Sequence, residues 1–178
     1  MLVTGESLHS PVFSFLYHRG SLADFLCRAR AREVDWVAGA ARKWRRAVDP
    51  TRLDMRDTIM EAIGIEVTEL SAERVVATMP VHGPTKQPFG VLHGGASVVL
   101  AETVASLGTY NLIDRESQLA MGLEINANHV RSKSEGLVTA VGTPLHRGRK
   151  IMVWDVRITD EEDKLVCVSR CTVAVVPK

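Results

Sequence analysis

The sequence predicts an α+β domain in which an antiparallel sheet wraps one long helix. The helix is indicated by a run from about Gly94 to Leu112 in which almost every residue is apolar or small. A helix that is apolar on all sides lies at the centre of a fold or in a membrane. Two strand-like runs precede this helix and four follow it. Their short connections suit antiparallel pairing, because parallel strands need long crossovers.

The remaining elements follow in chain order. Thr58 to Ile63 predicts a short helix that ends at Gly64. The clearest strand is 152–159, where apolar and polar residues alternate with a period of two. The predicted strands span residues 65–70, 74–81, 119–130, 136–143, 152–159 and 165–176, with a loop at 84–90 before the long helix.

Bulk properties limit the function classes. The chain has 178 residues, enough for one domain with a short extension, and its net charge of +1 gives no basis for binding nucleic acid. Glu102 interrupts the long apolar run, which argues against a membrane span. Cys167 and Cys171 stand four residues apart on a predicted strand, roughly 13 Å and beyond disulfide reach. With no secretory signal at the N-terminus, we expect free thiols and a cytoplasmic protein.

Residues 1–43 are predicted to form a separate N-terminal extension, and residues 44–178 the domain. From Ser21 onward, apolar residues recur every three or four positions and arginines occupy the opposite side. This pattern predicts a basic amphipathic helix. Its basic side is either solvated on a helix packed against protein, or it contacts a membrane surface or an acidic partner. An organelle-targeting segment is a further alternative.

The start of the long helix carries the residues that point to chemistry. Gly94 and Gly95 leave backbone N–H groups directed out of the helix N-terminus, a site for a negative oxygen. Acyl transfer needs such donors because charge develops on the carbonyl oxygen. Gln87 and His93 flank this point with side-chain donors. The alternative for the glycines is a tight turn or close backbone packing.

Glu102 is the one carboxylate in the long helix, and a buried carboxylate is costly without a function. It follows Gly94 by eight residues, about 12 Å along a helix. A glutamate side chain does not cover that distance, so we expect a dimer with two composite sites. Each site takes Gly94 from one chain and Glu102 from the other. Ser106, one turn further on the same face, can hold Glu102 or its water.

These residues resemble a known family. The run Gln-Pro-Phe-Gly-x-Leu-His-Gly-Gly-Ala-Ser-x-x-Leu-Ala-Glu at residues 87–102 is similar to that of the hotdog-fold thioesterases. The runs Gly-Leu-Glu-Ile-Asn-Ala-Asn-His-Val-Arg-Ser at 122–132 and Pro-Leu-His-x-Gly-Arg at 144–149 extend the match. The resemblance covers about residues 44–177. The most similar subgroup hydrolyses 1,4-dihydroxy-2-naphthoyl-CoA or clears misloaded aryl carriers, and the phenylacetate-type thioesterases are also similar.

The resemblance implies a role for each matching position. Glu102 acts as nucleophile or general base, the Gly94 N–H polarises the thioester carbonyl, and Gln87 and His93 orient water and substrate. Coenzyme A, as part of the substrate, lies along a channel lined by Gly122, His129, Val130, Arg131, Ser132, His146, Arg147, Gly148, Arg149 and Lys150. Without the resemblance, these basic residues also fit a solvated strand end.

The resemblance also bears on partners and assembly. It implies an acyl-CoA or aroyl-CoA substrate, no separate cofactor and no metal. We expect the dimer to be the smallest active unit and two dimers to form a homotetramer, and the sequence leaves the dimer open as the alternative. Two other functions stay open at this point: hydration of an unsaturated acyl-CoA, and binding of acyl-CoA by a regulator without turnover.

Overall fold

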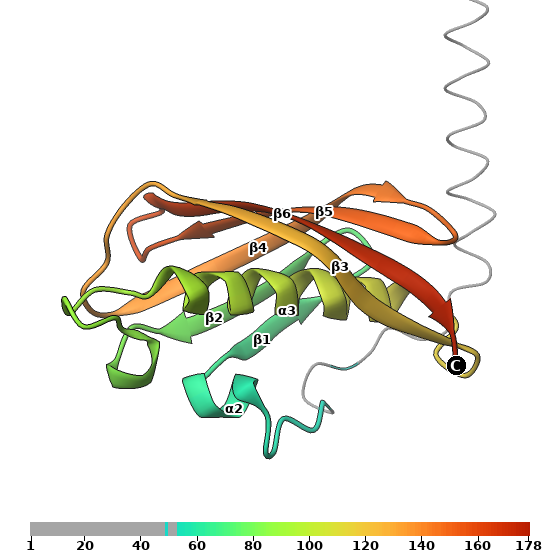
Figure 1. The fold of residues 1–178 in the computed structure, drawn as a ribbon, viewed down its shortest axis with the longest axis horizontal. Coiled ribbons are helices and arrows are strands. Elements are labelled where there is room, and N and C mark those ends of the chain that lie inside the picture. The colour runs from blue at the N-terminus through green and yellow to red at the C-terminus, as the bar shows by residue number, and fades with distance from the viewer. Residues whose placement is uncertain (1–48, 50–52) are drawn as a thin grey trace, which may run out of the picture. The chain divides into compact units, whose positions relative to one another are not determined.

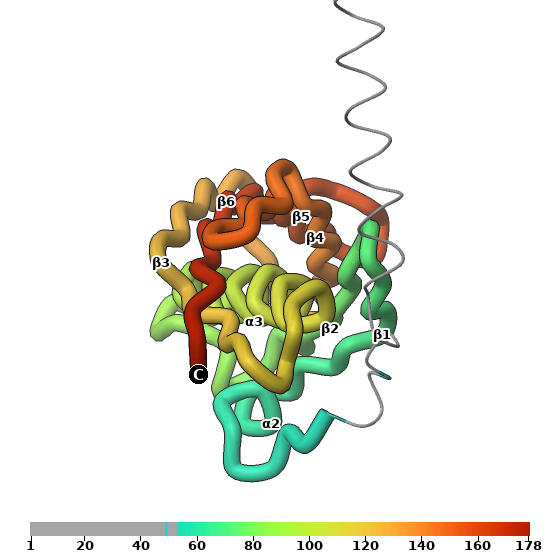
Figure 2. Tube along the Cα trace, turned by 90° about the vertical axis from the view of Figure 1, so that its right-hand side faces the viewer, coloured from blue at the N-terminus to red at the C-terminus, as the bar shows by residue number. Residues whose placement is uncertain are grey.

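The computed structural model describes Asp49 and residues 53–178. In this part of the chain, six strands form one sheet that packs on a long helix. Figure 1 shows the helix lying along the sheet, and Figure 2 shows the strands curling around it. The predicted α+β architecture is confirmed. The predicted extension, residues 1–43, lies outside the described residues, and its boundary stays a prediction.

The predicted elements are present with small shifts in their bounds. The strands are β1 (Glu66–Leu70), β2 (Val75–Pro80), β3 (Gln118–His129), β4 (Leu137–Arg147), β5 (Ile151–Thr159) and β6 (Leu165–Pro177). The helices are α2 (Ile59–Ile63), α3 (Gly94–Leu112) and a short 3-10 helix, η2 (Gly83–Thr85), in the segment predicted as loop. Gly64 ends α2 with φ +73°, a conformation that glycine adopts without strain.

The connection through α3 decides the sheet order, which is β1-β2-β4-β5-β6-β3 with all pairs antiparallel. The chain leaves β2, passes through α3, and enters β3 at the far edge of the sheet. β4 then returns to lie beside β2. As a result α3 packs on β2, β4, β5 and β6 as well as on β3. None of the helices in the described part of the chain has the length and apolar character that crossing a membrane requires.

A close contact between α3 and the middle of the sheet holds the helix in place. A Cβ at Gly108 would collide with the ring of Trp154, and a Cβ at Gly142 would collide with Val104. The indole nitrogen of Trp154 also donates a 2.9 Å hydrogen bond to the hydroxyl of Thr109. The glycines therefore permit helix and sheet to approach closely, with the one polar group of the indole satisfied.

β4 continues four residues beyond its predicted end at residue 143. The strand therefore includes Pro144, although proline lacks an N–H and is disfavoured inside a sheet. In the structure β2 pairs with β4 only between Leu137 and Gly142. At Pro144, β4 therefore has β5 as its one neighbouring strand in the described part of the chain. On its other side no strand is present that would need the N–H that proline lacks. The register shifts directly after Pro144.

β3 is an edge strand of twelve residues, and no described strand pairs with its outer edge. Its register with β6 shifts between Gly122 and Glu124. Large apolar side chains are exposed along it: Leu119, Met121 and Leu123 are 39%, 53% and 60% exposed. A long, apolar, unpaired edge is a template for pairing with another strand.

Candidate active site

The start of α3 presents one free backbone donor. His93 is the N-cap, and its Nδ1 accepts a 2.8 Å hydrogen bond from the N–H of Gly95. Within residues 53–178 the N–H of Gly94 has no partner. We predicted two unpaired glycine N–H groups, and for Gly95 this is wrong because the imidazole caps it. Since Nδ1 accepts, the neutral His93 ring carries its proton on Nε2, which can donate to a ligand.

The loop before α3 orients Gln87. Its Oε1 accepts a 2.8 Å hydrogen bond from the N–H of Phe89, which leaves the amide NH₂ as the available donor. Gly90, with φ +84°, lets the chain reverse so that the backbone N–H of Gln87 reaches the carbonyl of Val91. The exposed His93 and half-buried Gln87 therefore both offer donors beside the helix start.

His129, at the end of β3, lies directly against the helix start. A Cβ at Gly94 would stand 2.8 Å from Nε2 of His129. Close packing thus explains why residue 94 is glycine. A pocket of about 390 Å³ opens here, lined by Val91, Leu92, Gly94, Ser97, His129, Val130, Arg131, Ser132 and Val166. Four of the residues predicted to line a coenzyme A channel, 129–132, belong to it.

Glu102 lies further along α3, and its side chain lies against β3. A Cβ at Gly122 would collide with Oε1 of Glu102, so Gly122 provides the space for the carboxylate. The expectation that Glu102 is buried is wrong for a single protomer: its side chain is half-buried, on the side of α3 next to the open edge of β3. Ser106 is also half-buried. Neither side chain hydrogen-bonds to another described residue.

The pKa of Cys171, on β6, is affected by the negative charges near Glu102. Burial raises the pKa of its thiol to about 12, and the nearby carboxylates of Glu102 and Glu124 add to the effect. A thiol with this pKa stays neutral at physiological pH and is not a nucleophile. Cys167 and Cys171 are both buried and free, as predicted.

The chain is similar to several known proteins. A family model described as Thioesterase superfamily matches residues 89–167. A protein of Bacillus subtilis with the name "Putative esterase ComA2" is 56% identical over 126 residues, which are 71% of this chain and 100% of that protein. The 1,4-dihydroxy-2-naphthoyl-CoA hydrolase of Listeria monocytogenes is 48% identical over 120 residues, 67% of this chain and 97% of that protein. The chain belongs to the thioesterase superfamily.

A solved structure agrees with this assignment. A mutant thioesterase of Pseudomonas aeruginosa superposes on this thioesterase with a TM-score of 0.73 at 42% identity, covering 76% of this chain and 99% of that one. The predicted hotdog fold is confirmed. The protein is therefore a thioesterase, an enzyme that hydrolyses thioesters.

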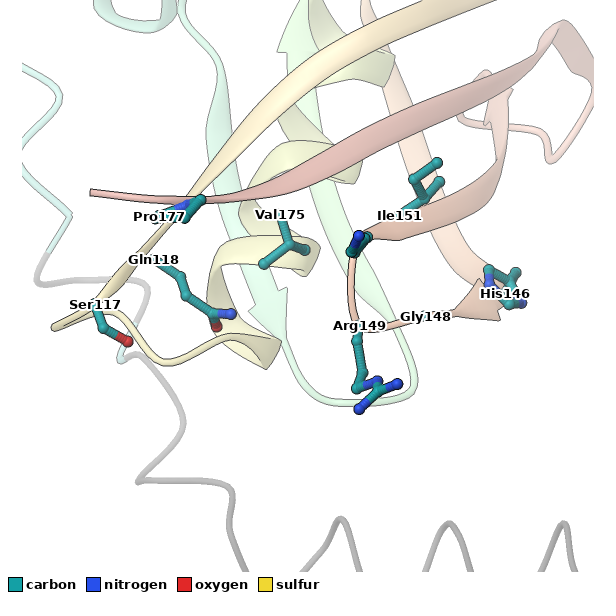
Figure 3. Close-up of a pocket in the computed structure, with 9 residues that line it drawn as sticks. Ser117, Gln118, His146, Gly148, Arg149, Ile151, Val175 and Pro177 are labelled. Carbon is teal, nitrogen blue, oxygen red and sulfur yellow. The ribbon is translucent and has the colours of Figure 1, made fainter.

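Four of the other residues predicted for coenzyme A lie at the opposite end of the thioesterase sheet: His146, Gly148, Arg149 and Lys150. A second pocket of about 850 Å³ is lined by Ser117, Gln118, His146, Gly148, Arg149, Lys150, Ile151, Val175 and Pro177. Figure 3 shows Ser117 and Gln118 on one side of it and Arg149 on the turn after β4. Gln118 and His129 are the two ends of β3, and eleven residue steps of strand span roughly 36 Å. Within one protomer, most of the residues predicted to line the coenzyme A channel therefore lie in two groups, at opposite ends of β3.

Arg147 has a contact that sequence reasoning did not foresee. Its guanidinium donates a 2.7 Å hydrogen bond to the carbonyl of Ala72, in the turn between β1 and β2. The side chain thus ties the end of β4 to a neighbouring hairpin. Its predicted role beside coenzyme A stays a prediction.

Sequence reasoning missed Ser97, Ser117 and Gln118 as lining residues of this thioesterase. Ser97 follows Gly94 by three residues, a spacing that puts both on one side of a helix and could have identified it. Ser117 and Gln118 reach their pocket only through the pairing of β3 with β6, for which the sequence gives no local signal. Among the described residues, no cluster of three or more His, Cys, Asp or Glu side chains is placed to hold a metal ion.

Proposed function

We propose that this thioesterase hydrolyses acyl-CoA thioesters, aroyl-CoA in particular, at a site shared by two protomers. The carboxylate of Glu102 comes from one protomer and the N–H of Gly94 from the other. The observation that carries the proposal is the separation of these groups within one chain. Gly94 packs on His129 and Glu102 on Gly122, at positions seven residues apart along β3.

If the β3 edges of two protomers pair with each other, each protomer completes the site of the other. Edge strands of two copies that pair antiparallel around a two-fold axis bring their α3 helices side by side in opposite directions. The half-exposed stripe with Glu102 and Ser106 then faces the helix start of the partner subunit. The exposed apolar side chains along β3 favour this pairing.

The same pairing brings the two pockets together. In an antiparallel pair, the Gln118 end of one β3 lies beside the His129 end of the other. The pocket with Arg149 and Lys150 then adjoins the pocket at the helix start of the partner subunit. Arg131, Arg149 and Lys150 are all exposed, and cations of this kind bind the phosphates of a nucleotide. The division of the channel residues thus favours a coenzyme A ester that crosses between subunits.

In this arrangement the thioester oxygen accepts a hydrogen bond from the Gly94 N–H, which grows stronger as the carbon becomes tetrahedral. Glu102 removes a proton from water, whose oxygen adds to the carbonyl carbon. The C–S bond then breaks, and the thiolate recovers the proton from Glu102. In the alternative route Glu102 itself adds to the carbonyl and the C–S bond breaks to release the thiolate. Water then hydrolyses the resulting anhydride to the free acid and Glu102, whose proton passes to the thiolate. Both routes give the free acid and coenzyme A.

Substitution of Glu102 tests whether hydrolysis requires its carboxylate. We expect Glu102→Gln to reduce kcat for benzoyl-CoA or 2-naphthoyl-CoA by a factor of about 10³ because neither route has its base or nucleophile. Thiol release is followed with a thiol-reactive dye, and thermal unfolding checks the fold. A variant that keeps wild-type turnover would contradict the role of Glu102.

Gly94 offers a matched pair of variants. It is the first residue of α3, where proline is tolerated, and His93 has φ −72° and ψ 131°, which a following proline accepts. Gly94→Pro removes the N–H, whereas Gly94→Ala keeps it; both add a Cβ against His129. The loss of kcat in Gly94→Pro beyond that in Gly94→Ala therefore measures the N–H.

Mixing two inactive variants tests the shared site. A dimer of one Glu102→Ala chain and one Gly94→Pro chain contains one intact site if each site combines two protomers. Random mixing then restores about a quarter of the wild-type activity, since half of the dimers are mixed. No recovery in a verified mixed dimer would mean that each site lies within one protomer.

A further inference from the structure

The loop between β3 and β4, residues 130–136, forms part of the pocket at the helix start. Three of its residues line that pocket: Val130, Arg131 and Ser132. The carbonyl of Lys133 accepts a 2.7 Å hydrogen bond from the backbone N–H of Leu92, just before α3. The position of the loop therefore affects both the pocket and the segment that leads into the helix.

Glu161 reaches this loop from the turn between β5 and β6. One oxygen of its carboxylate accepts a hydrogen bond from the Lys133 ammonium, and the other accepts one from the backbone N–H of Leu137. Between these two donors stands Gly136, with φ +84°, where a Cβ would lie 2.0 Å from the carboxylate. In the described part of the chain, Glu161 is the one side chain from outside the loop that hydrogen-bonds to it.

The turn that carries Glu161 is ordered, and it adjoins Arg131. The carboxylate of Asp160 accepts hydrogen bonds from two backbone N–H groups of the same turn, at 2.9 and 3.0 Å. The Nε of Arg131 donates to the carbonyl of Leu165, directly after the turn, at 3.4 Å. A bond of this length is weak, so the place of the Arg131 side chain depends mainly on where the loop lies.

We infer that Glu161 is a positioning residue, which holds loop 130–136 so that the Arg131 guanidinium meets the phosphates of the coenzyme A nucleotide. This inference rests on the proposed function, in which Arg131 is one of the cations that bind these phosphates. Glu161 does not line the pocket, so it acts on the substrate only through the loop.

Glu161→Gln removes this restraint with little change of shape. A carboxylate offers acceptor oxygens to both of its donors, Lys133 and the N–H of Leu137. A glutamine amide has one acceptor oxygen, and its NH₂ group then faces a second donor. One of the two attachments of the loop is therefore lost in this variant.

Two thioesters that differ in the nucleotide test the role of Glu161. Benzoyl-CoA carries the phosphates, whereas S-benzoylpantetheine has the same thioester and lacks the nucleotide. We expect Glu161→Gln to raise the KM for benzoyl-CoA about fivefold, the size of one exposed charge contact, and to leave kcat unchanged. The KM for S-benzoylpantetheine should stay that of the wild type, because Arg131 has no phosphate to bind. Thiol release measures all four constants.

Glu162→Gln is the matched control. Glu162 is the next residue of the same turn, and among the described residues its side chain pairs only with the exposed Lys164. We expect this variant to have wild-type kcat and KM with both thioesters. Thermal unfolding of each variant checks that it is folded at the assay temperature.

A double variant tests whether Glu161 acts through Arg131. Arg131→Ala alone should also raise the KM for benzoyl-CoA about fivefold. Because Glu161 acts by placing Arg131, adding Glu161→Gln to Arg131→Ala should give no further rise. Independent effects would instead multiply to roughly twenty-five-fold.

The outcomes separate this inference from the proposed function. An active wild type whose KM for benzoyl-CoA is unchanged in Glu161→Gln or in Arg131→Ala overturns the positioning role and leaves the proposed function intact. The positioning role is also overturned by an equal rise with both thioesters, by a loss confined to kcat, or by multiplied effects in the double variant. A wild type that releases no thiol from benzoyl-CoA contradicts the proposed function and this inference with it.

Discussion

The two sides of α3 differ in how completely their polar groups are satisfied. Toward β4 and β5 the helix packs without gaps on Trp154, and the indole N–H is bonded to Thr109. Toward β3 the same helix leaves the Gly94 N–H, the Ser97 hydroxyl and the Glu102 carboxylate without partners among residues 53–178. The first side holds the fold together. The β3 side keeps hydrogen-bond donors and a carboxylate available for a substrate. A functional site is expected on this side, because unsatisfied polar groups are typical of such sites.

After the loss expected for Glu102→Gln, the largest effect on the β3 side is expected from Gly122. Gly122→Ala puts a methyl group where the Glu102 carboxylate lies, so the carboxylate must move. A displacement of about 1 Å costs roughly 100-fold in kcat. The measurement is steady-state thiol release by the purified variant. Gly83→Ala is the control because a Cβ at Gly83 meets nothing within 4 Å. Equal activity of the two variants would mean that Gly122 does not position Glu102.

On the packed side the expected effect is on stability. Gly108→Ala forces a methyl group against the Trp154 ring, and overpacking of this kind costs about 1–3 kcal/mol. Urea unfolding of this variant and of the wild type measures the difference in free energy. Substrate turnover per folded molecule should change much less than in Gly122→Ala. If Gly108→Ala instead lost turnover and kept its stability, the packed side of α3 would not be the side that mainly stabilises the fold.

A smaller effect is expected at the pocket beyond the far end of β3. Arg149→Ala removes an exposed cation, and we expect the KM for a coenzyme A ester to rise several-fold with little change in kcat. The increase should shrink as salt is raised from roughly 0.05 to 0.5 M, because salt screens exposed charges. Arg56→Ala, which removes an exposed arginine paired with Asp54, is the control. A KM that does not depend on Arg149 would argue against phosphate binding there.

The smallest effect concerns a surface contact near the helix-start pocket. Lys133 and the backbone N–H of Leu137 donate to Glu161, and they lower the pKa of Glu161 from 4.5 to about 2. A lowered pKa means that the folded state favours the charged carboxylate. The resulting stabilisation is complete above about pH 4.5 and is lost as the pH falls toward 2.

Glu161→Gln should therefore be slightly less stable than the wild type at pH 7, with the difference shrinking below pH 4.5. Urea unfolding at several pH values measures this. Glu162→Gln is the control, because Glu162 pairs only with the exposed Lys164 among the described residues. A Glu161→Gln deficit that stays constant down to pH 2 would rule out an electrostatic origin.

Much of this protein is readable from its residues alone. The apolar run and its glycine pair identify α3 to the residue at both ends, and the period of two identifies the strands, because both patterns are local. The motif around Gly94 and Glu102 identifies the family and the reaction class. The distance along the helix already indicates that these two residues cannot meet within one chain.

Other features depend on groups that are distant in the sequence. The space that Gly122 leaves for Glu102, the packing of His129 on Gly94 and the division of basic residues between two pockets all follow from which edge of the sheet β3 joins. The solitary hydroxyl of Ser97 appears only when every possible acceptor around it is known. Periodicity reveals which face of an element is buried, but the contacts made on that face are set by the packing of the whole chain.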